Sequence, residues 1–387
     1  MVDSEQAVTT IFLLVFFLIY GGVHLYLFLG AKASLALGTS TGIFVALFMI
    51  IMVLAPIIVH MSERNGFESF AVFFSWTGYL WMGTIFLFFC LSLVFDCCRI
   101  LIHMGEHILS IDLSSIIPSA RNCFIALLSI SIATALYGYI EALNIRSEKI
   151  TIRTSKIPEE IKRFRIVQIS DLHIGLIVRE KRLKRILKEI RAANPDILFS
   201  TGDLVDGQAD NMSGSADLLR EINPEYGKFA VTGNHEFYAG LAQALDFTRR
   251  AGFTVLRGEG SSVGGFINIA GVDDPTARIY GATEGAPEEK LLSGFSDDEF
   301  TILLKHQPVV LRGSPVLFDL QLSGHTHKGQ IFPFTLLTRL FFAFNSGCYH
   351  LAEGSVLYVS RGAGTWGPPM RLMAPPEITI IDLVHGE

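Results

Sequence analysis

The stretch Arg165-Ile166-Val167-Gln168-Ile169-Ser170-Asp171-Leu172-His173 decides the fold, because an apolar run ends in an Asp and a His, residue types that can bind metals. Apolar runs of this length are typical of buried strands, so Asp171 and His173 are expected on the loop that follows. Four later blocks also place such side chains where an apolar run ends: Gly202-Asp203, Gly233-Asn234-His235-Glu236, His306 and Gly324-His325-Thr326-His327.

The spacing of the blocks indicates where they meet. The first three are about thirty residues apart, which is the length of one strand–helix–strand unit. Parallel strands would bring the blocks to the same edge of a sheet. Carboxylate and amide oxygens mixed with imidazoles suit divalent first-row metals such as Mn, Fe or Zn. The sequence therefore predicts a metal site at that edge.

Over roughly residues 148–387, the five blocks in this order resemble the calcineurin-like metallophosphoesterase superfamily. The resemblance implies an α/β domain with a four-layer αββα sandwich, and the strand-rich later half also favours a mixed sheet sandwich. The ending, residues 360–371 and 375–378, is similar to a membrane-associated bacterial branch. Some members of that branch cleave the pyrophosphate of UDP-diacylglucosamine, a lipid A precursor.

The resemblance implies two divalent metal ions and attack by a metal-bound hydroxide. Asp203 would bridge the two ions, since a carboxylate has two oxygens to share. Asp171, His173 and His327 would complete one metal shell. Asn234, His306 and His325 would complete the other. His325 and His327 are two residues apart, so an extended segment would point both in the same direction.

His235 follows a metal ligand but is not assigned as one. By resemblance it protonates the leaving oxygen, and Asp206 supplies the partner that orients it. Gly207 stands where the protein-phosphatase branch has an Arg, so a phosphoprotein substrate is not expected. The candidate replacements for that phosphate clamp are Lys328, Arg361 and Arg371, with Arg361 the first choice. A surface or capping charge explains each of the three equally well.

The N-terminal part has the composition of a membrane protein. Half of the chain is hydrophobic, and four uncharged runs are each long enough to cross a bilayer as a helix. We expect an anchor over residues 1–145, with spans at about 8–30, 42–60, 70–95 and 122–140, and a phosphoesterase domain over 146–387. Basic residues between Arg146 and Arg165 outnumber those of the opposite-side loops, which include a long loop at 96–121. This bias predicts a multi-pass inner-membrane protein with a cytoplasmic catalytic domain.

Two further stretches suggest contact with the lipid bilayer. The apolar segment 331–344 contains Phe341 and Phe342 and reads as a loop or short helix beside the metal site. It would receive acyl chains, although an ordinary core segment has the same composition. The basic helix predicted at 179–193 fits either anionic headgroups or a solvated face. It carries no interleaved aromatic residues, so nucleic acid is not expected as a partner.

The sequence thus predicts a membrane-anchored, metal-dependent phosphohydrolase that cleaves a phosphodiester or pyrophosphate of a lipid-linked substrate. Two alternatives remain open at this stage. One is a phosphodiesterase or phosphomonoesterase acting on soluble nucleotides. The other is a non-catalytic membrane receptor that retains the fold.

Overall fold

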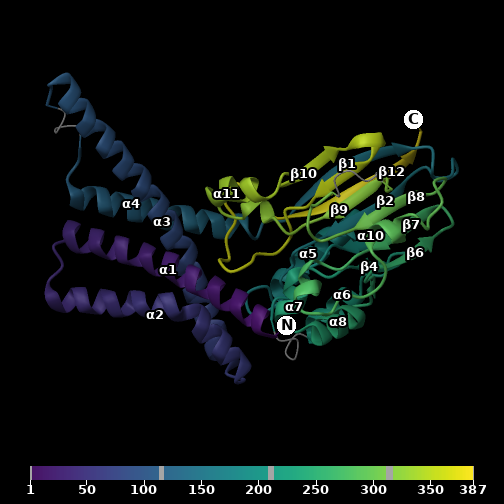
Figure 1. Ribbon diagram of the computed structural model, residues 1–387, viewed down its shortest axis with the longest axis horizontal. Coiled ribbons are helices and arrows are strands. Elements are labelled where there is room, and N and C mark those ends of the chain that lie inside the picture. The colour runs from purple at the N-terminus through teal and green to yellow at the C-terminus, as the bar shows by residue number, and fades with distance from the viewer. Residues whose placement is uncertain (1, 113–116, 208–212, 311–316, 387) are drawn as a thin grey trace. The chain divides into compact units, whose positions relative to one another are not determined.

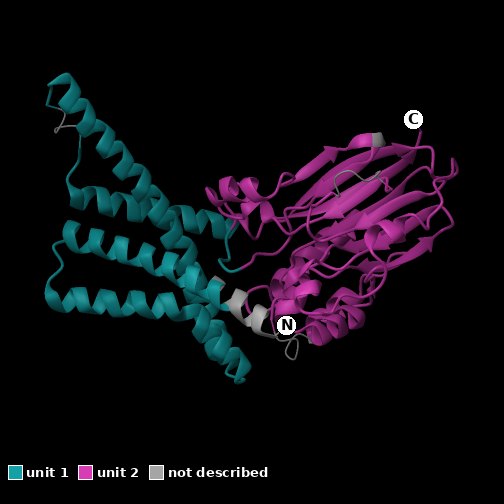
Figure 2. Ribbon diagram, viewed as in Figure 1, with its two compact units in different colours: residues 1–140, 367–370 teal, residues 141–366, 371–387 magenta. Residues whose placement is uncertain are grey.

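The computed structural model describes residues 2–112, 117–207, 213–310 and 317–386. The chain divides into two compact units (Figure 2). Unit 1 comprises Met1–Ile140 with Gly367–Met370, and unit 2 comprises Glu141–Trp366 with Arg371–Glu387.

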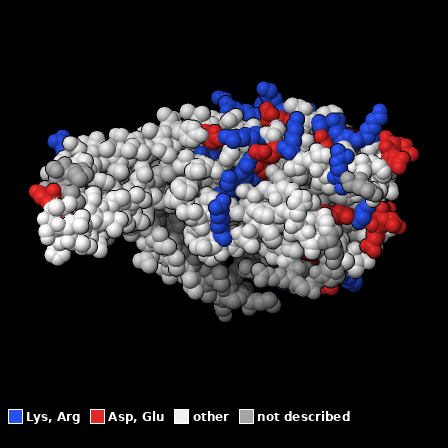
Figure 3. All heavy atoms as spheres, turned by 90° about the horizontal axis from the view of Figure 1, so that it is seen from above, with Lys and Arg blue, Asp and Glu red and all other residues white. Residues whose placement is uncertain are grey.

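Unit 1 contains four long helices, α1 (Val2–Ser34), α2 (Thr39–Arg64), α3 (Glu68–Leu109) and α4 (Ala120–Glu141) (Figure 1). All four are long and apolar enough to cross a membrane. Large apolar side chains such as Leu18 and Phe44 are more than 70% exposed, and Figure 3 shows few charges over this part of the surface. Side chains of this kind face lipid rather than water, so the chain is a membrane protein.

The predicted loop at 96–121 is wrong in its first half. Helix α3 continues to Leu109, and His103 and His107 lie on it. His103 Nδ1 is 2.8 Å from Glu106 Oε2, and this local pair lets the helix continue past the apolar run.

Unit 2 is built on two six-stranded sheets. The first has the order β1-β12-β2-β3-β4-β5 and the second has the order β10-β11-β9-β8-β7-β6. The strands of the first sheet are β1 (Arg146–Thr154), β2 (Phe164–Ile169), β3 (Ile197–Ser200), β4 (Lys228–Ala230), β5 (Thr254–Val255) and β12 (Glu377–His385). Those of the second are β6 (Glu259–Val263), β7 (Ile267–Gly271), β8 (Phe300–Leu304), β9 (Leu320–Ser323), β10 (Gly347–His350) and β11 (Val356–Val359).

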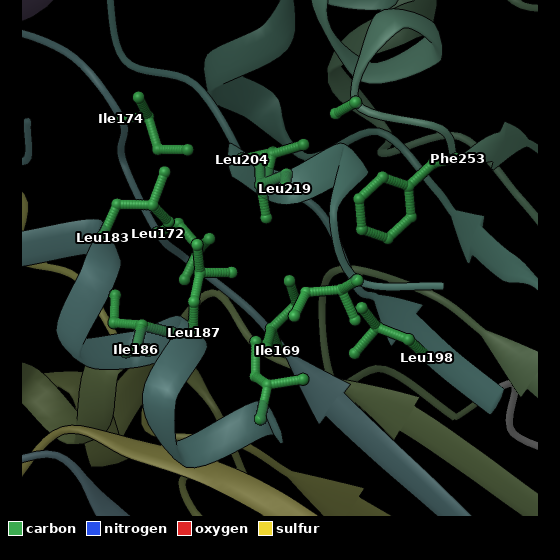
Figure 4. Close-up of a cluster of buried hydrophobic side chains, with 14 of the residues drawn as sticks. Ile169, Leu172, Ile174, Leu183, Ile186, Leu187, Leu198, Leu204, Leu219 and Phe253 are labelled. Atoms are coloured by element: carbon green, nitrogen blue, oxygen red, sulfur yellow. The ribbon is translucent and has the colours of Figure 1, made fainter. Parts of the chain in front are cut away.

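Both faces of the first sheet are buried, which explains the continuous apolar runs of its central strands. On one face, Ile169 and Leu198 pack against Leu183 and Leu187 of α5 (Glu180–Ala193) (Figure 4). On the other face, Ile166 and other side chains pack against the second sheet. Helices α6 (Ser213–Arg220) and α8 (Leu241–Arg250) add side chains to the cluster around α5, and the short helix α7 (Asn234–Ala239) contacts α8.

A smaller layer covers the far side of the second sheet, where Leu292 of α10 (Glu288–Leu292) packs with Ala270 and Leu303. The layers therefore run helix, sheet, sheet, helix, as predicted. The last short elements are α9 (Thr276–Ile279), α11 (Phe334–Phe341) and the 3₁₀ turns η3 (His327–Gly329) and η4 (Ala352–Gly354).

The strand directions bring the five sequence blocks together. Strands β2, β3 and β4 are parallel neighbours, as are β8 and β9 in the second sheet. Parallel strands end at a common edge, so the loops after β2, β3, β4, β8 and β9 meet there. This edge carries the candidate site.

Candidate metal centre

The predicted ligands form one cluster at the carboxyl edge of the sheets. Three overlapping groups have ligand atoms within 4.8 Å of one another: Asp171, His173 and His327; His173, Asp203 and His235; Asp203, His306 and His325. Five of these residues are buried, and His235 and His325 are partly exposed.

The first group gathers around His327. Its Nε2 lies 3.3 Å from Asp171 Oδ1 and 3.0 Å from His173 Nε2. The two imidazole rings are stacked, with centroids 5.0 Å apart. Three ligand atoms thus point into one small volume.

The second group gathers around His306 and His325. His306 Nε2 lies 3.2 Å from Asp203 Oδ2 and 3.2 Å from His325 Nδ1. Asn234 Oδ1 is 3.0 Å from His325 Nδ1. The backbone carbonyl of Thr201 accepts from His306 Nδ1 at 2.7 Å, which leaves Nε2 to face the cluster.

Asp203 lies between the two groups. Its Oδ2 is 3.2 Å from His306 Nε2 and 3.8 Å from His173 Nε2. A carboxylate in this position reaches both sets of ligands, which is the geometry that a bridging ligand needs.

The donor set fits divalent cations. Burial lowers the pKa of both His173 and His325 to about 4, and it also holds that of His327 well below the usual range. These imidazoles are therefore neutral near pH 7, the form that coordinates a metal. Burial raises the pKa of Asp203, but the neighbouring His306 outweighs it and holds that pKa well below the usual range. Asp203 is thus an ionised carboxylate, and against the effect of burial it raises the pKa of the adjacent His306 well above the usual range. A bound cation would take the place of that proton, since an imidazole must be neutral to bind a metal.

The loops that carry the ligands are locally strained. Asp171, His173, Asp203, His325 and His327 all have positive φ angles, between 47° and 72°. Non-glycine residues adopt this left-handed conformation at a cost, and such residues are concentrated at functional sites. Gly202 has a φ of 96°, and a Cβ there would lie 2.7 Å from His306 Nδ1, so the loop needs glycine before Asp203.

The prediction that His325 and His327 share an extended segment is wrong. Both residues are left-handed, and His327 begins the 3₁₀ turn η3. These turns direct the two side chains to different groups, His325 toward His306 and His327 toward Asp171.

His235 lies beside the cluster with a carboxylate partner. It donates from Nδ1 to Asp206 Oδ1 at 2.7 Å, and its ring centroid is 4.6 Å from that of His173. Burial lowers the pKa of His235, but Asp203 and Asp206 outweigh it and raise the pKa to about 9. A protonated imidazole next to the ligand cluster can give a proton to a leaving oxygen.

Comparisons with known proteins agree with this geometry. Residues 164–329 match the family described as calcineurin-like phosphoesterase. An uncharacterized metallophosphoesterase of Aquifex aeolicus is 44% identical over 258 residues, which cover 66% of this chain and 97% of that protein. The chain belongs to the calcineurin-like metallophosphoesterases. It is therefore a hydrolase of phosphate esters.

A second relative of this metallophosphoesterase combines the domain with a membrane part. The transmembrane protein with metallophosphoesterase domain of Danio rerio is 34% identical over 278 residues. The match covers 68% of this chain and 63% of that protein.

Two carboxylates that sequence reasoning gave no role support the site of the metallophosphoesterase. Glu236 accepts from the backbone N–H of Asp203 at 3.0 Å and from that of Gly233 at 2.7 Å, which ties two ligand loops together. Asp274 is 1% exposed and accepts from Gln307 at 2.9 Å. Asp274 comes shortly after the end of β7, so its position after a strand could have marked it in the sequence as a residue of the site.

The three predicted phosphate-binding residues are placed differently from one another. Arg361 is 16% exposed and forms ion pairs with Glu148 and Glu377. Arg371 is fully buried and donates from Nη2 to His327 Nδ1 at 3.0 Å. Among the described residues, no carboxylate lies within ion-pair distance of Lys328, which directly follows His327. Two of the three predicted cations are thus held by other groups of the domain.

Aromatic side chains lie beside the cluster of predicted metal ligands. The ring of Phe342 is 5.1 Å from that of His325, whereas Phe341 is 75% exposed. The rings of Tyr238 and Trp366 lie 5.4 and 5.9 Å from that of His235, and both side chains are more than half exposed. A substrate at this site would meet apolar surface on two sides.

Proposed function

We propose that this protein is a membrane-anchored dinuclear phosphohydrolase that cleaves a phosphodiester or pyrophosphate of a lipid-linked substrate. The observation that carries the proposal is the cluster of buried imidazoles and carboxylates with His235 held beside it by Asp206. Residues 1–145 would anchor the catalytic domain, residues 146–387, to the inner membrane on its cytoplasmic side.

Seven residues would hold the two metal ions. Asp203 would bridge them; the other ligands are Asp171, His173 and His327 on one side and Asn234, His306 and His325 on the other. Mn, Fe or Zn suits this set of oxygen and nitrogen donors. Two such ions, when bound, neutralise the phosphate oxygens and acidify the attacking water.

His235 would serve the leaving group. Its Nδ1 is engaged by Asp206, so Nε2 is the atom left to face a substrate. The charged ring can give its proton to the departing oxygen, and the Asp206 carboxylate stabilises the charged form until then.

The lipid-linked substrate is supported by apolar surface close to the ligands. Phe342 contacts His325, and the exposed Phe341 adjoins it in the chain. Exposed aromatic and aliphatic surface beside a polar site is a liability unless an amphiphile covers it. A nucleotide-activated lipid, such as the UDP-diacylglucosamine of similar bacterial enzymes, has the required combination of anionic and apolar parts.

The purified full-length protein in detergent tests this function. It is loaded with Mn and incubated with a panel of lipid pyrophosphates, phosphodiesters and soluble nucleotides, with products identified by mass. We expect cleavage of a lipid-linked member at a kcat/KM at least about ten-fold above that of any soluble nucleotide. Faster cleavage of soluble nucleotides would favour the alternative, a nucleotide phosphodiesterase or phosphomonoesterase. No cleavage of any member by metal-loaded protein would favour a non-catalytic receptor.

A further inference from the structure

Helix α11 exposes several large apolar side chains on one face. We define the α11 patch as four of them: Leu336 (55%), Leu337 (44%), Leu340 (81%) and Phe341 (75%). Four large apolar residues within eight helical positions exceed what a water-facing helix normally exposes.

The other side of α11 is fixed to the metal-site loop. Thr335 is buried, and its hydroxyl donates to the carbonyl of Lys328 at 2.8 Å. Arg339, one turn further along, is exposed. An apolar face with flanking cations is typical of a helix that lies in the bilayer interface.

Contacts within unit 2 connect α11 to Ala142, which follows the end of α4 in the sequence. Only residues 142–145 separate the membrane span α4 from β1, and such a segment reaches less than about 20 Å. The buried Arg182 donates to the carbonyl of Ala142 at 3.0 Å and to the hydroxyl of Thr365 at 2.9 Å. The loop that carries Thr365 therefore lies directly beside Ala142.

Further hydrogen bonds connect the loop that carries Thr365 and Trp366 to α11. The Gln330 side chain accepts from the backbone N–H of Trp366 at 2.9 Å and donates to its carbonyl at 2.8 Å. Phe332 donates from its backbone to the carbonyl of Leu372 at 3.1 Å, just before α11 begins. Trp366 itself is 52% exposed, and Trp is enriched where protein meets the membrane interface.

We propose that α11 lies in the interface of the bilayer, with the α11 patch in contact with acyl chains and the metal centre open toward the headgroups. The occupant of this surface is the lipid membrane that already holds the four spans. The inference rests on the proposed function, because a helix in this position would let the metal centre reach a lipid-linked phosphate without extracting the lipid. The two can be tested separately, because the position of α11 can be measured without any turnover.

Photocrosslinking in a bilayer tests the placement. The full chain carries p-benzoylphenylalanine in place of Leu340 and is reconstituted in nanodiscs of phosphatidylethanolamine and phosphatidylglycerol. A second variant carries the probe in place of Leu337, on the same helix. The matched control carries it in place of Glu159, whose side chain is 83% exposed. Glu159 lies beyond the far end of β1, about 30 Å along the strand from the tether.

We expect lipid adducts, identified by mass, at residues 340 and 337 at least about five-fold above residue 159. Equal adduct levels at the three positions, or capture of the protein's own chain alone at 340 and 337, would overturn the inference. Cleavage of a lipid-linked substrate without lipid adducts would overturn the placement and leave the proposed function standing. Lipid adducts without any cleavage would support the placement of α11 and contradict the proposed function.

Discussion

At the scale of single residues, neighbouring histidines have opposite charge states because their surroundings differ. Burial keeps His173 and His325 neutral, with pKa values lowered to about 4, as metal ligation requires. His235 is also mostly buried, but Asp203 and Asp206 raise its pKa to about 9. Carboxylates thus give His235 a charge state different from that of His173 and His325, whereas Asp203 also raises the pKa of His306, another predicted ligand.

The role of His235 predicts a dependence on the leaving group. His235→Ala should lower kcat by about 10²–10⁴-fold on an alkyl phosphodiester, whose departing oxygen needs a proton. The loss should be much smaller on a p-nitrophenyl ester, whose leaving group departs as a stable anion. Steady-state kinetics on both substrates measure the difference. Equal losses on the two would mean that His235 supports the nucleophile or the ligand shell instead.

Sequence reasoning predicted which residues cluster at the sheet edge but not their backbone conformation. The predicted ligands were visible because each one ends an apolar run, as Asp203 does after β3. The left-handed turns at His325 and His327 were not visible, because their φ angles depend on contacts with loops far away in sequence. The burial of Arg371 against His327 also arises only when the C-terminal segment folds over the site.

At the scale of elements, the site depends on how the strands of the first sheet are held in register. Strand β12 pairs antiparallel with β2, and Arg165 lies opposite Asp382. The two side chains form a bidentate pair, with Nε–Oδ1 2.7 Å and Nη2–Oδ2 2.9 Å. The buried strand that ends before Asp171 followed from the sequence, whereas this pairing joins residues more than 200 positions apart and did not.

The pair predicts a pH-dependent stability. Arg165 holds the pKa of Asp382 below its usual value, so the pair stabilises the fold above about pH 4 and loses its effect as the pH falls through the lowered pKa. Asp382→Asn should lower the free energy of unfolding by about 1 kcal/mol at pH 7, since the pair is partly exposed. Denaturant unfolding of the metal-free protein from pH 7 to pH 3 measures the gap between variant and wild type. A gap that stays constant at all these pH values would contradict the assignment.

The apolar residues around α11 predict a selective effect on substrate binding. Phe341→Ser with Phe342→Ser should raise the KM for a lipid-linked substrate by roughly ten- to hundred-fold, because each buried methylene contributes about 0.8 kcal/mol. Hydrolysis of a short water-soluble ester should hardly change. Ile279→Ser, which alters an exposed apolar residue outside α11, is the matched control. Equal losses on both substrates would indicate damage to the core, and no loss on either would favour soluble nucleotides.

At the scale of the whole molecule, the four spans set the side of the membrane on which hydrolysis takes place. An even number of spans puts both termini on the same side. Basic residues such as Arg146 and Arg153 follow the last span, and basic segments stay in the cytoplasm. We therefore expect the catalytic domain to work on the cytoplasmic face.

A fusion test examines this orientation. A reporter that is active only in the cytoplasm, joined after Glu387, should be active, and alkaline phosphatase at the same position should be silent. The opposite pattern would place the domain outside the cytoplasm and make an extracytoplasmic lipid the better substrate.

The most direct test of the central claim measures metal content and hydrolysis in one preparation of the full-length protein. The account predicts about two Mn ions per chain in the wild type, with phosphodiester hydrolysis that is lost with EDTA and restored by Mn. Asp203→Asn, which keeps the size of the side chain but removes the charge shared between the ions, should lower kcat by at least roughly 100-fold while the protein stays folded. Near-wild-type activity of the Asp203→Asn variant with two metals still bound would contradict the account.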